Sequence, residues 1–358
     1  MSIQKFNILD LFSGAGGFSS GLEYNKYFST KIAVDFDKYA CKTFENNFGN
    51  AIVINEDISI DSIKKKITDL AKKNNINMII GGPPCQGFSL KGKRMGFDDQ
   101  RNHLFEDFLQ IVEIIKPEIY VIENVVGIIS SEKGYFINKI MELSKKMGYK
   151  VTINILNAKY FNVPQDRKRV FIICSKTNEI TIENNTQNKT ITVRDAISDL
   201  SYLESGEGTF ESDYKLDAKS IYQKNMRYKK LYNHVATKHS EKAIAKLKLI
   251  PAESDKKFLP EHLLGNQKFS TTWSRLIWDD VSPTIDTRFD TPSNGRNSHP
   301  ELHRSITPRE AARIQSFKDS FIFYGPKTSI CKQIGNAVPP NLAYEISKKI
   351  AQSYNLKG

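Results

Sequence analysis

Residues 6–17 read FNILDLFSGAGG, an apolar run that passes directly into a loop rich in glycine. The apolar part predicts a buried strand, and the glycines let the backbone turn tightly and approach a ligand. Similar apolar runs, separated by segments long enough for a helix, recur at residues 31–35, 52–54, 78–80, 119–122, 150–153 and 170–173. Strands that alternate with helices in this way predict an α/β fold, with a mostly parallel Rossmann-like sheet and helices on both faces.

The alternation stops after Thr177, where polar residues dominate. Helices are expected again at residues 241–250 and 304–317, the second opened by Thr307 as cap and Pro308 at the first helical position. A loop over residues 333–340 and a helix over residues 341–354 close the chain. We therefore expect a catalytic domain, formed by residues 1–177 and completed when residues 318–358 fold back onto it. A smaller irregular domain with a hinge is expected over residues 178–317.

The bulk composition favours a polyanionic partner. The 358 residues carry 52 lysines and arginines against 40 aspartates and glutamates, a formal net charge of +12, and basic proteins of this kind often bind nucleic acid. No apolar run is long enough to span a membrane, and the N-terminus lacks the apolar core of a signal peptide. Four cysteines stand far apart with no CxxC pair, which disfavours a disulfide framework or a zinc site. We expect an intracellular protein.

The glycine loop is followed at the end of the next predicted strand by Asp35, a residue suited to hold ribose hydroxyls. The loop departs from the dinucleotide fingerprint GxGxxG, because Ser19 stands where the last glycine belongs. This disfavours a dehydrogenase and favours an adenosine cofactor without pyrophosphate. A glycine turn with only a packing role remains the alternative.

Two further segments follow predicted strands at their carboxyl ends, where α/β sheets bind ligands. Residues 82–89 read GPPCQGFS and place Cys85 after two prolines. Most lone cysteines are small buried hydrophobes, but the prolines before and the glycine-rich loop after disfavour that role here. Glu123 follows the strand at residues 119–122 and is either solvated or catalytic. If the strands are neighbours, Cys85 and Glu123 lie at the same edge of the sheet.

Residues 165–169 read QDRKR, in which Arg167 and Arg169 share one face of an extended chain. A surface charge run is the alternative interpretation of an isolated pair of this kind.

These segments, in this order, resemble the DNA (cytosine-5)-methyltransferase family, of the bacterial restriction-modification type. The resemblance rests on the glycine loop, GPPCQGFS, ENV at residues 123–125, QxRxR, RSITPREAARIQSF at residues 304–317 and QIGNAVPP at residues 333–340. It covers nearly the whole chain except about residues 178–270. It implies transfer of a methyl group from S-adenosylmethionine to carbon 5 of cytosine in double-stranded DNA.

The resemblance also implies roles for single residues. Cys85 matches the thiolate that adds to cytosine C6, and Glu123 the glutamate that protonates the base at N3. Arg169 and Arg167 match the arginines that contact the cytosine edge and brace this site. The residues that match the cofactor pocket are Phe12, Ala15, Gly17, Asp35, Phe36, Asp57, Ile58, Pro84, Leu104, Asn336 and Val338. Asp35 is one methylene shorter than the glutamate common at the ribose position.

A cytosine inside a duplex exposes neither C6 nor N3 to a side chain, so the resemblance also implies that the base is flipped out. In the loop after Cys85 we expect DNA contacts from Gln86, Ser89, Lys91 and Arg94. In the family the segment after residue 177 reads the target sequence, and its candidate contacts are Arg227, Lys229, Lys230 and Arg275. Most of these contacts should be to the DNA backbone.

Two other functions remain open at this point. One is a tRNA cytosine-5 methyltransferase on the same fold, disfavoured by the long segment before residue 270. The other is a non-catalytic DNA-binding relative, disfavoured because Cys85, Glu123 and Arg169 occur together. We expect a monomer in the bacterial cytoplasm that acts on DNA without a metal or a membrane, and a cognate restriction endonuclease that acts on the same site.

Overall fold

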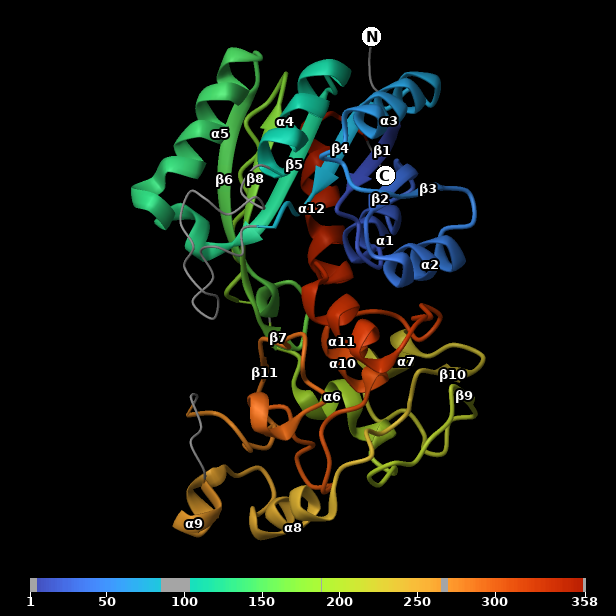
Figure 1. Cartoon of the computed structure of the whole chain (residues 1–358), viewed down its shortest axis with the longest axis vertical. Coiled ribbons are helices and arrows are strands. Elements are labelled where there is room, and N and C mark those ends of the chain that lie inside the picture. The colour runs from blue at the N-terminus through green and yellow to red at the C-terminus, as the bar shows by residue number, and fades with distance from the viewer. Residues whose placement is uncertain (1–4, 85–103, 188, 265–269, 357–358) are drawn as a thin grey trace. The chain divides into compact units, whose positions relative to one another are not determined.

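The computed structural model describes residues 5–84, 104–187, 189–264 and 270–356. The chain divides into two compact units, coloured by residue number in Figure 1. Unit 1 comprises Met1–Asn157, Lys168–Asn185 and Leu342–Gly358, and unit 2 comprises Ala158–Arg167 and Thr186–Asn341. The fold of each unit is described separately.

Unit 1 is built on a seven-stranded sheet in the order β3-β2-β1-β4-β5-β8-β6. In chain order its strands are β1 (Phe6–Leu11), β2 (Phe28–Asp35), β3 (Ile52–Asn55), β4 (Met78–Gly81), β5 (Ile119–Val125), β6 (Lys150–Asn157) and β8 (Lys168–Ser175). The strands from β3 to β5 pair in parallel, whereas β8 runs antiparallel to both β5 and β6. The prediction of a mostly parallel sheet is confirmed.

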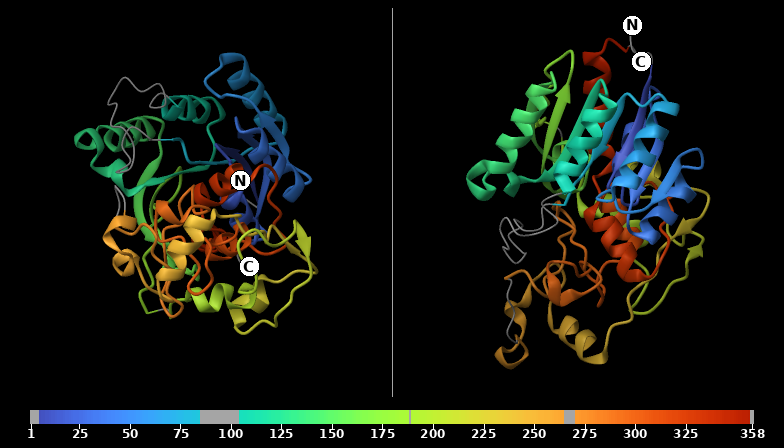
Figure 2. Two further views of the ribbon diagram at one scale, coloured as in Figure 1. Left: turned by 60° about the horizontal axis from the view of Figure 1, so that its bottom comes forward. Right: turned by 45° about the horizontal axis from the view of Figure 1, so that its top comes forward.

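Helices cover both faces of this sheet, as predicted (Figure 1 and Figure 2). Because strand side chains alternate, Leu9 and Leu11 point to the face on which α3 (Asp61–Lys73), α4 (Leu104–Ile115) and α5 (Tyr135–Lys146) pack. Phe171 points to the other face and meets Phe18 of α1 (Gly17–Glu23) edge to face at 5.9 Å. Tyr344 of α12 (Pro340–Ser353) meets Tyr24, the residue after α1, edge to face at 6.2 Å. Helix α2 (Lys38–Asn47) follows β2.

Unit 2 consists of short elements joined by long loops. Its α-helices are α6 (Val193–Ile197), α7 (Ile221–Met226), α8 (Glu241–Leu249), α9 (Glu261–Leu264), α10 (Pro308–Ile314) and α11 (Lys327–Asn336). Its strand pairs are β7 (Gln165–Asp166) with β11 (Ser282–Pro283), and β9 (Glu211–Ser212) with β10 (Leu231–Tyr232). The chain also forms 3-10 turns at Val126–Ile129, Ser131–Gly134, Ala158–Tyr160, Ser198–Leu200, Lys256–Phe258 and Pro292–Asn294.

The start of α10 agrees with the sequence prediction. Thr307 is its N-cap, Pro308 occupies the first turn, and Thr307 and Glu310 form a reciprocal capping box. The loop expected over residues 333–340 is wrong in its first half, because α11 continues to Asn336. Gly335 serves close packing there and not a turn: a Cβ atom at this position would lie 2.5 Å from the backbone oxygen of Asp286.

The predicted domain boundaries at residues 177 and 317 also need correction. The compact units separate after residues 157, 167, 185 and 341, so residues 318–341 belong with unit 2. The physical reason is that α11 packs on α10 and on the loop at Asp286, all within unit 2. No helix among the described residues is both long and apolar enough to cross a bilayer.

Candidate active site

The candidate site lies at the carboxyl edge of the sheet in unit 1, where β1, β4 and β5 end. The glycine loop follows β1, Gly82–Pro84 follows β4, and Glu123 lies near the end of β5. Since β1, β4 and β5 are adjacent and parallel, these segments lie side by side. The condition for the predicted approach of Cys85 to Glu123, that β4 and β5 are parallel neighbours, is met. Cys85 itself lies outside the described residues.

Asp35 holds the glycine loop in place. Its Oδ2 accepts a hydrogen bond from the Gly14 backbone N–H at 2.8 Å, and its Oδ1 accepts one from the Asp37 N–H at 2.9 Å. Gly14 and Gly16 have φ of 53° and 93°, which glycine adopts without a steric cost. A Cβ atom on Gly16 would lie 2.6 Å from the Phe48 ring. The loop therefore depends on both the glycines and Asp35.

Asp10 lies buried behind this loop, and sequence reasoning assigned it no role. Its side chain is 2% exposed and accepts a hydrogen bond from Ser19 Oγ at 2.6 Å. Burial, opposed by that hydrogen bond and reinforced by the charge of Asp35, raises the pKa of Asp10 to about 8. Burial also raises the pKa of Asp35. Asp10 is thus mostly protonated at neutral pH and adds no second full negative charge beside Asp35.

Two observations fit this loop to an adenosine cofactor. Phe36, directly after Asp35, is 78% exposed, and an exposed aromatic ring is suited to lie against a purine. Ser13 Oγ is buried and has no hydrogen-bond partner among the described residues, so a polar ligand group would satisfy it.

The other predicted cofactor residues in unit 1 fall into two groups. Ala15 and Gly17 are buried in the loop and at the start of α1, and Phe12 packs against the core with a φ of 58°. Ile58 is buried in the core, so only its backbone is suited to meet a ligand, whereas Asp57 is exposed and accepts the Ser59 N–H at 2.9 Å. Pro84 and Leu104 border the residues that are not described. Their contacts with a cofactor stay predictions.

Glu123 and Arg169 form the central ion pair of the site. Val125 is paired with Arg169 across β5 and β8, so Glu123, two residues earlier, shares a face with Arg169 and lies within diagonal reach. Arg169 Nε lies 3.1 Å from Glu123 Oε1, and both side chains are largely buried. The Arg169 guanidinium also donates to the Lys168 carbonyl at 2.8 Å. The pair fixes the direction of the Glu123 carboxylate.

The same stretch of β5 holds the segment that leads to Cys85. Asn124 Nδ2 donates to the Pro83 carbonyl oxygen at 3.0 Å, and this contact is buried. A Cβ atom on Gly82 would lie 3.0 Å from Glu123 Oε2, so the glycine lets the chain pass close to the carboxylate. Asn124 was part of the ENV motif but received no role from the sequence. The structure gives Asn124 a positioning role, because it holds Pro83, two residues before Cys85.

Arg167 directly follows β7 and belongs to unit 2. Its guanidinium is 1% exposed and donates to the Gly335 carbonyl at 2.9 Å and to the Ile285 carbonyl at 3.3 Å. These contacts join β7 to α11 within unit 2. Asn336 and Val338 also lie in unit 2, the first exposed and the second buried. The catalytic role of Arg167 and the cofactor contacts of Asn336 and Val338 stay predictions.

The prediction that Arg275 contacts DNA is wrong. Its side chain is completely buried, and its nitrogen atoms donate to four backbone carbonyls at 2.7–3.1 Å. Those carbonyls belong to the end of α8 and to the loop at residues 299–302, and His303 is a further partner at 2.9 Å. Burial lowers the pKa of Arg275 to about 10. Arg275 thus clamps this loop to α8, a role that no local sequence signal revealed.

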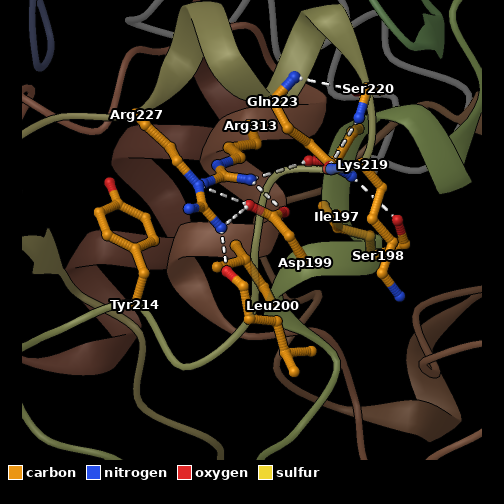
Figure 3. A network of polar contacts seen from close by, with 12 residues as sticks. Ile197, Ser198, Asp199, Leu200, Tyr214, Lys219, Ser220, Gln223, Arg227 and Arg313 are labelled. Carbon is orange, nitrogen blue, oxygen red and sulfur yellow. Dashed lines mark hydrogen bonds and ion pairs between the residues drawn. The ribbon is translucent and has the colours of Figure 1, made fainter.

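Arg227 also has a structural role. Its Nε and Nη2 atoms lie 3.0 and 2.9 Å from Asp199 Oδ2, and its guanidinium lies over the Tyr214 ring at 4.3 Å (Figure 3). The other oxygen of Asp199 accepts from Arg313 Nη1 at 2.6 Å, and Arg313 binds Asp319 through two further hydrogen bonds. Because its guanidinium is engaged within unit 2, the geometry does not support Arg227 as a DNA contact.

Of the remaining predicted DNA contacts, two lie among the described residues and four lie outside them. Lys229 is exposed, and Lys230 is half-buried and pairs with Asp213 at 2.7 Å on the surface of unit 2. Gln86, Ser89, Lys91 and Arg94 lie outside the described residues. These contacts stay predictions.

Comparisons with known proteins agree with one another. A family model described as C-5 cytosine-specific DNA methylase matches residues 6–352. The Type II methyltransferase M.DdeI of Desulfomicrobium norvegicum is 37% identical over 376 residues, which cover 96% of this chain and 88% of that protein. The Type II methyltransferase M1.HphI of Haemophilus parahaemolyticus is 34% identical over 351 residues, 96% of this chain and 86% of that protein.

A solved structure agrees as well. A protein described as a DNA modification methyltransferase encoded within a prophage (E. coli) superposes with a TM-score of 0.79 at 27% identity. The match covers 98% of this chain and 100% of that chain.

Proposed function

Since this chain belongs to the C-5 cytosine-specific DNA methylase family, we propose that Cys85 is the nucleophile with which it methylates a flipped cytosine in a specific duplex sequence. Membership makes the chain a DNA (cytosine-5)-methyltransferase that uses S-adenosylmethionine, as the sequence motifs predicted. The observation that carries the proposal is the pairing of Glu123 with Arg169 beside the segment held by Asn124.

Carbon 5 of cytosine is a weak nucleophile in the intact aromatic ring. Addition of the Cys85 thiolate to C6 breaks the C5–C6 double bond and shifts electron density to C5 and to N3. A proton delivered to N3 neutralises the charge that develops there. Glu123 is the group for this step, since Arg169 holds one of its oxygens and leaves the carboxyl group oriented.

S-adenosylmethionine supplies the methyl group that C5 takes up, and the loop around Gly14, Asp35 and Phe36 is where this chain would hold it. After methylation C5 carries both a methyl group and a hydrogen. Removal of that hydrogen as a proton by a base, for which solvent water is available, re-forms the C5–C6 double bond and expels Cys85 as a thiolate, while N3 returns its proton to the Glu123 carboxylate. The ring becomes aromatic again, and every bond formed to the enzyme is broken.

Bisulfite sequencing of DNA from cells that express the chain tests the activity and reads the target sequence at once. Wild type should protect one short motif, and Cys85→Ala should protect none. Duplex DNA with 5-fluorocytosine at that motif should trap wild type covalently, because fluorine does not leave as a proton. Methylation by Cys85→Ala at the wild-type rate would refute the mechanism.

The role of Glu123 is tested with the same DNA. Glu123→Gln removes the proton donor and keeps the size of the side chain, so the methylation rate should fall by about 10²–10⁴-fold, the usual worth of general acid catalysis. DNA affinity should change little, because phosphate contacts supply most of it. Glu118→Gln, outside the site, is the matched control. Equal loss of rate in both variants would remove Glu123 from the mechanism.

We further propose that unit 2 reads the target sequence and that a cognate endonuclease cuts the same sequence when it is unmethylated. The support is that the similar proteins are Type II methyltransferases. Exchange of residues 186–341 for those of a relative with another target should move the methylated motif while Cys85 remains required. A chimera that methylates the original motif would place sequence reading in unit 1. We also expect a monomer located with the bacterial chromosome, which sedimentation and cell fractionation test.

A further inference from the structure

The amino edge of the unit 1 sheet, opposite the candidate active site, carries a row of lysines for which the proposed reaction has no use. Lys5 precedes β1, Lys116 precedes β5, and Lys150 opens β6. All three side chains are exposed. We call Lys5, Lys116 and Lys150 the amino-edge row; the labels β1, β5 and β6 in Figure 1 mark the strands that they precede or open.

Backbone contacts make this row one continuous surface. Asn77 Nδ2 donates to the Lys5 carbonyl at 2.9 Å, and Glu118 N donates to the Asn77 carbonyl at 2.9 Å. Lys176 N donates in turn to the Glu118 carbonyl at 3.0 Å. Ser175, beside Lys176, is paired with Lys150 across β8 and β6. The three lysines therefore belong to one rigid sheet edge.

The spacing follows from the strand order. β1 and β5 are separated by β4, and β5 and β6 are separated by β8. Adjacent strands lie about 4.8 Å apart, so neighbouring lysines of the row are about 10 Å apart at the backbone. One DNA strand advances about 3.4 Å per phosphate along the helix axis. The row is therefore about 20 Å long, which corresponds to the axial advance of about six phosphates.

Among the described residues, no ion pair cancels the charge of the amino-edge row. No ion pair joins Lys5, Lys116 or Lys150 to any described residue. Glu118, two residues after Lys116, forms an ion pair with Lys176 at 3.7 Å. Exposed glutamates also lie near the edge, Glu113 on α4 and Glu179 after β8. The lysines of this edge outnumber these glutamates, because α3 and α5 each end in two further lysines.

Helix dipoles do not account for the whole pattern. Lysines in the last turns of α3 and α5 complement the partial negative charge of a helix C-terminus. Lys5 and Lys150 do not belong to a helix end: no described helix ends before Lys5, and Lys150 lies four residues after the end of α5. A row of unpaired lysines on a rigid edge is instead suited to the phosphates of a polyanion.

We propose that the amino-edge row is a second, sequence-independent binding surface for duplex DNA. Lysines that meet only phosphates carry no sequence information. The enzyme would hold one DNA segment for methylation and a second segment at the opposite edge of the sheet. This surface lets the protein pass from one DNA segment to another before it releases the first.

The protein is first saturated with a short duplex that contains the methylated motif. A second, labelled short duplex is then added, and sedimentation measures how many duplexes each protein molecule binds. Wild type should bind two duplexes, and K5Q/K116Q/K150Q should bind one. K5R/K116R/K150R should restore the second, since either cation serves a phosphate. K42Q/K65Q/K66Q, which removes the same charge from α2 and α3, is the matched control and should bind two.

Two further readouts separate this proposal from the proposed reaction. The glutamine variant should methylate the short duplex at the wild-type rate, which also shows that it folds. The salt dependence of its total DNA binding should flatten by up to about 2.7 in the slope of log K against log[salt], the value for three phosphate contacts. One duplex per wild-type protein, or two per glutamine variant, would overturn the proposal. Binding of wild type to anionic lipid vesicles in place of the second duplex would overturn it as well.

Discussion

Replacement of Asp10 by asparagine should make the stability of the enzyme less sensitive to pH. Asp10 is buried behind the glycine loop, and burial raises its pKa to about 8. Asparagine has nearly the shape of a protonated aspartate and can accept the same hydrogen bond from Ser19. The variant therefore resembles the wild-type protein with Asp10 permanently neutral.

The magnitude follows from the two pKa values. In the unfolded chain an aspartate has a pKa of about 3.9, so between about pH 4 and pH 8 the folded state holds one proton that the unfolded state has released. Over this window the free energy of unfolding falls by about 1.4 kcal/mol per pH unit as the pH rises. From pH 5 to pH 7, wild type should lose about 3 kcal/mol relative to Asp10→Asn.

Urea unfolding of both proteins at pH 5, 6 and 7 measures this difference. Other groups titrate alike in the two proteins, so the difference between their unfolding free energies isolates Asp10. Asp61→Asn, which removes a carboxyl group that is 96% exposed, should show no such trend. A wild-type minus Asp10→Asn difference that stays constant with pH, or that grows in favour of wild type, would refute the neutral state of Asp10.

Two further predictions concern the cofactor loop and unit 2. Asp35→Ala should weaken binding of S-adenosylhomocysteine by about 1–3 kcal/mol in calorimetry, the cost of losing hydrogen bonds to a charged group, and unchanged affinity would remove Asp35 from the site. Arg313→Met should lower the free energy of unfolding by about 3–5 kcal/mol, because Asp199 and Asp319 lose their buried partner. Arg194→Met breaks an exposed pair with Asp279 and should cost less than about 1 kcal/mol; equal losses in chemical denaturation would contradict the importance of burial.

The fold was predictable because its signal is local. Each strand of the parallel part is a short apolar run, and buried parallel strands such as β4 consist of such runs alone. The reversal of β8 was also within reach of the sequence. Only ten residues separate Asn157 from Lys168, and a parallel crossover usually needs a dozen or more.

Sequence motifs assigned the candidate site residues, whereas the tertiary contacts of these residues could not be predicted. Glu123 and Arg169 were assigned through the resemblance, and their ion pair follows from the β5–β8 register, which the sequence does not state. In the sequence Arg275 is not distinguishable from the other basic residues of its segment. In the structure its guanidinium donates hydrogen bonds to four backbone carbonyls. Which arginine is buried depends on residues far away in sequence, such as Leu247 and Leu302.

The assembly of unit 1 from three separate stretches of chain has a consequence for biosynthesis. Helix α12 brings Leu342, Ile346 and Ile350 into the interior, and Tyr354 contacts Phe6 and bonds to Ser175. A ribosome that adds about 5–20 residues per second needs roughly 10–40 seconds to go from residue 157 to residue 342. Throughout that time the sheet face that α12 covers stays open to water. We therefore expect the nascent chain to expose the apolar surface of unit 1 for longer than a chain whose domains follow one another in sequence.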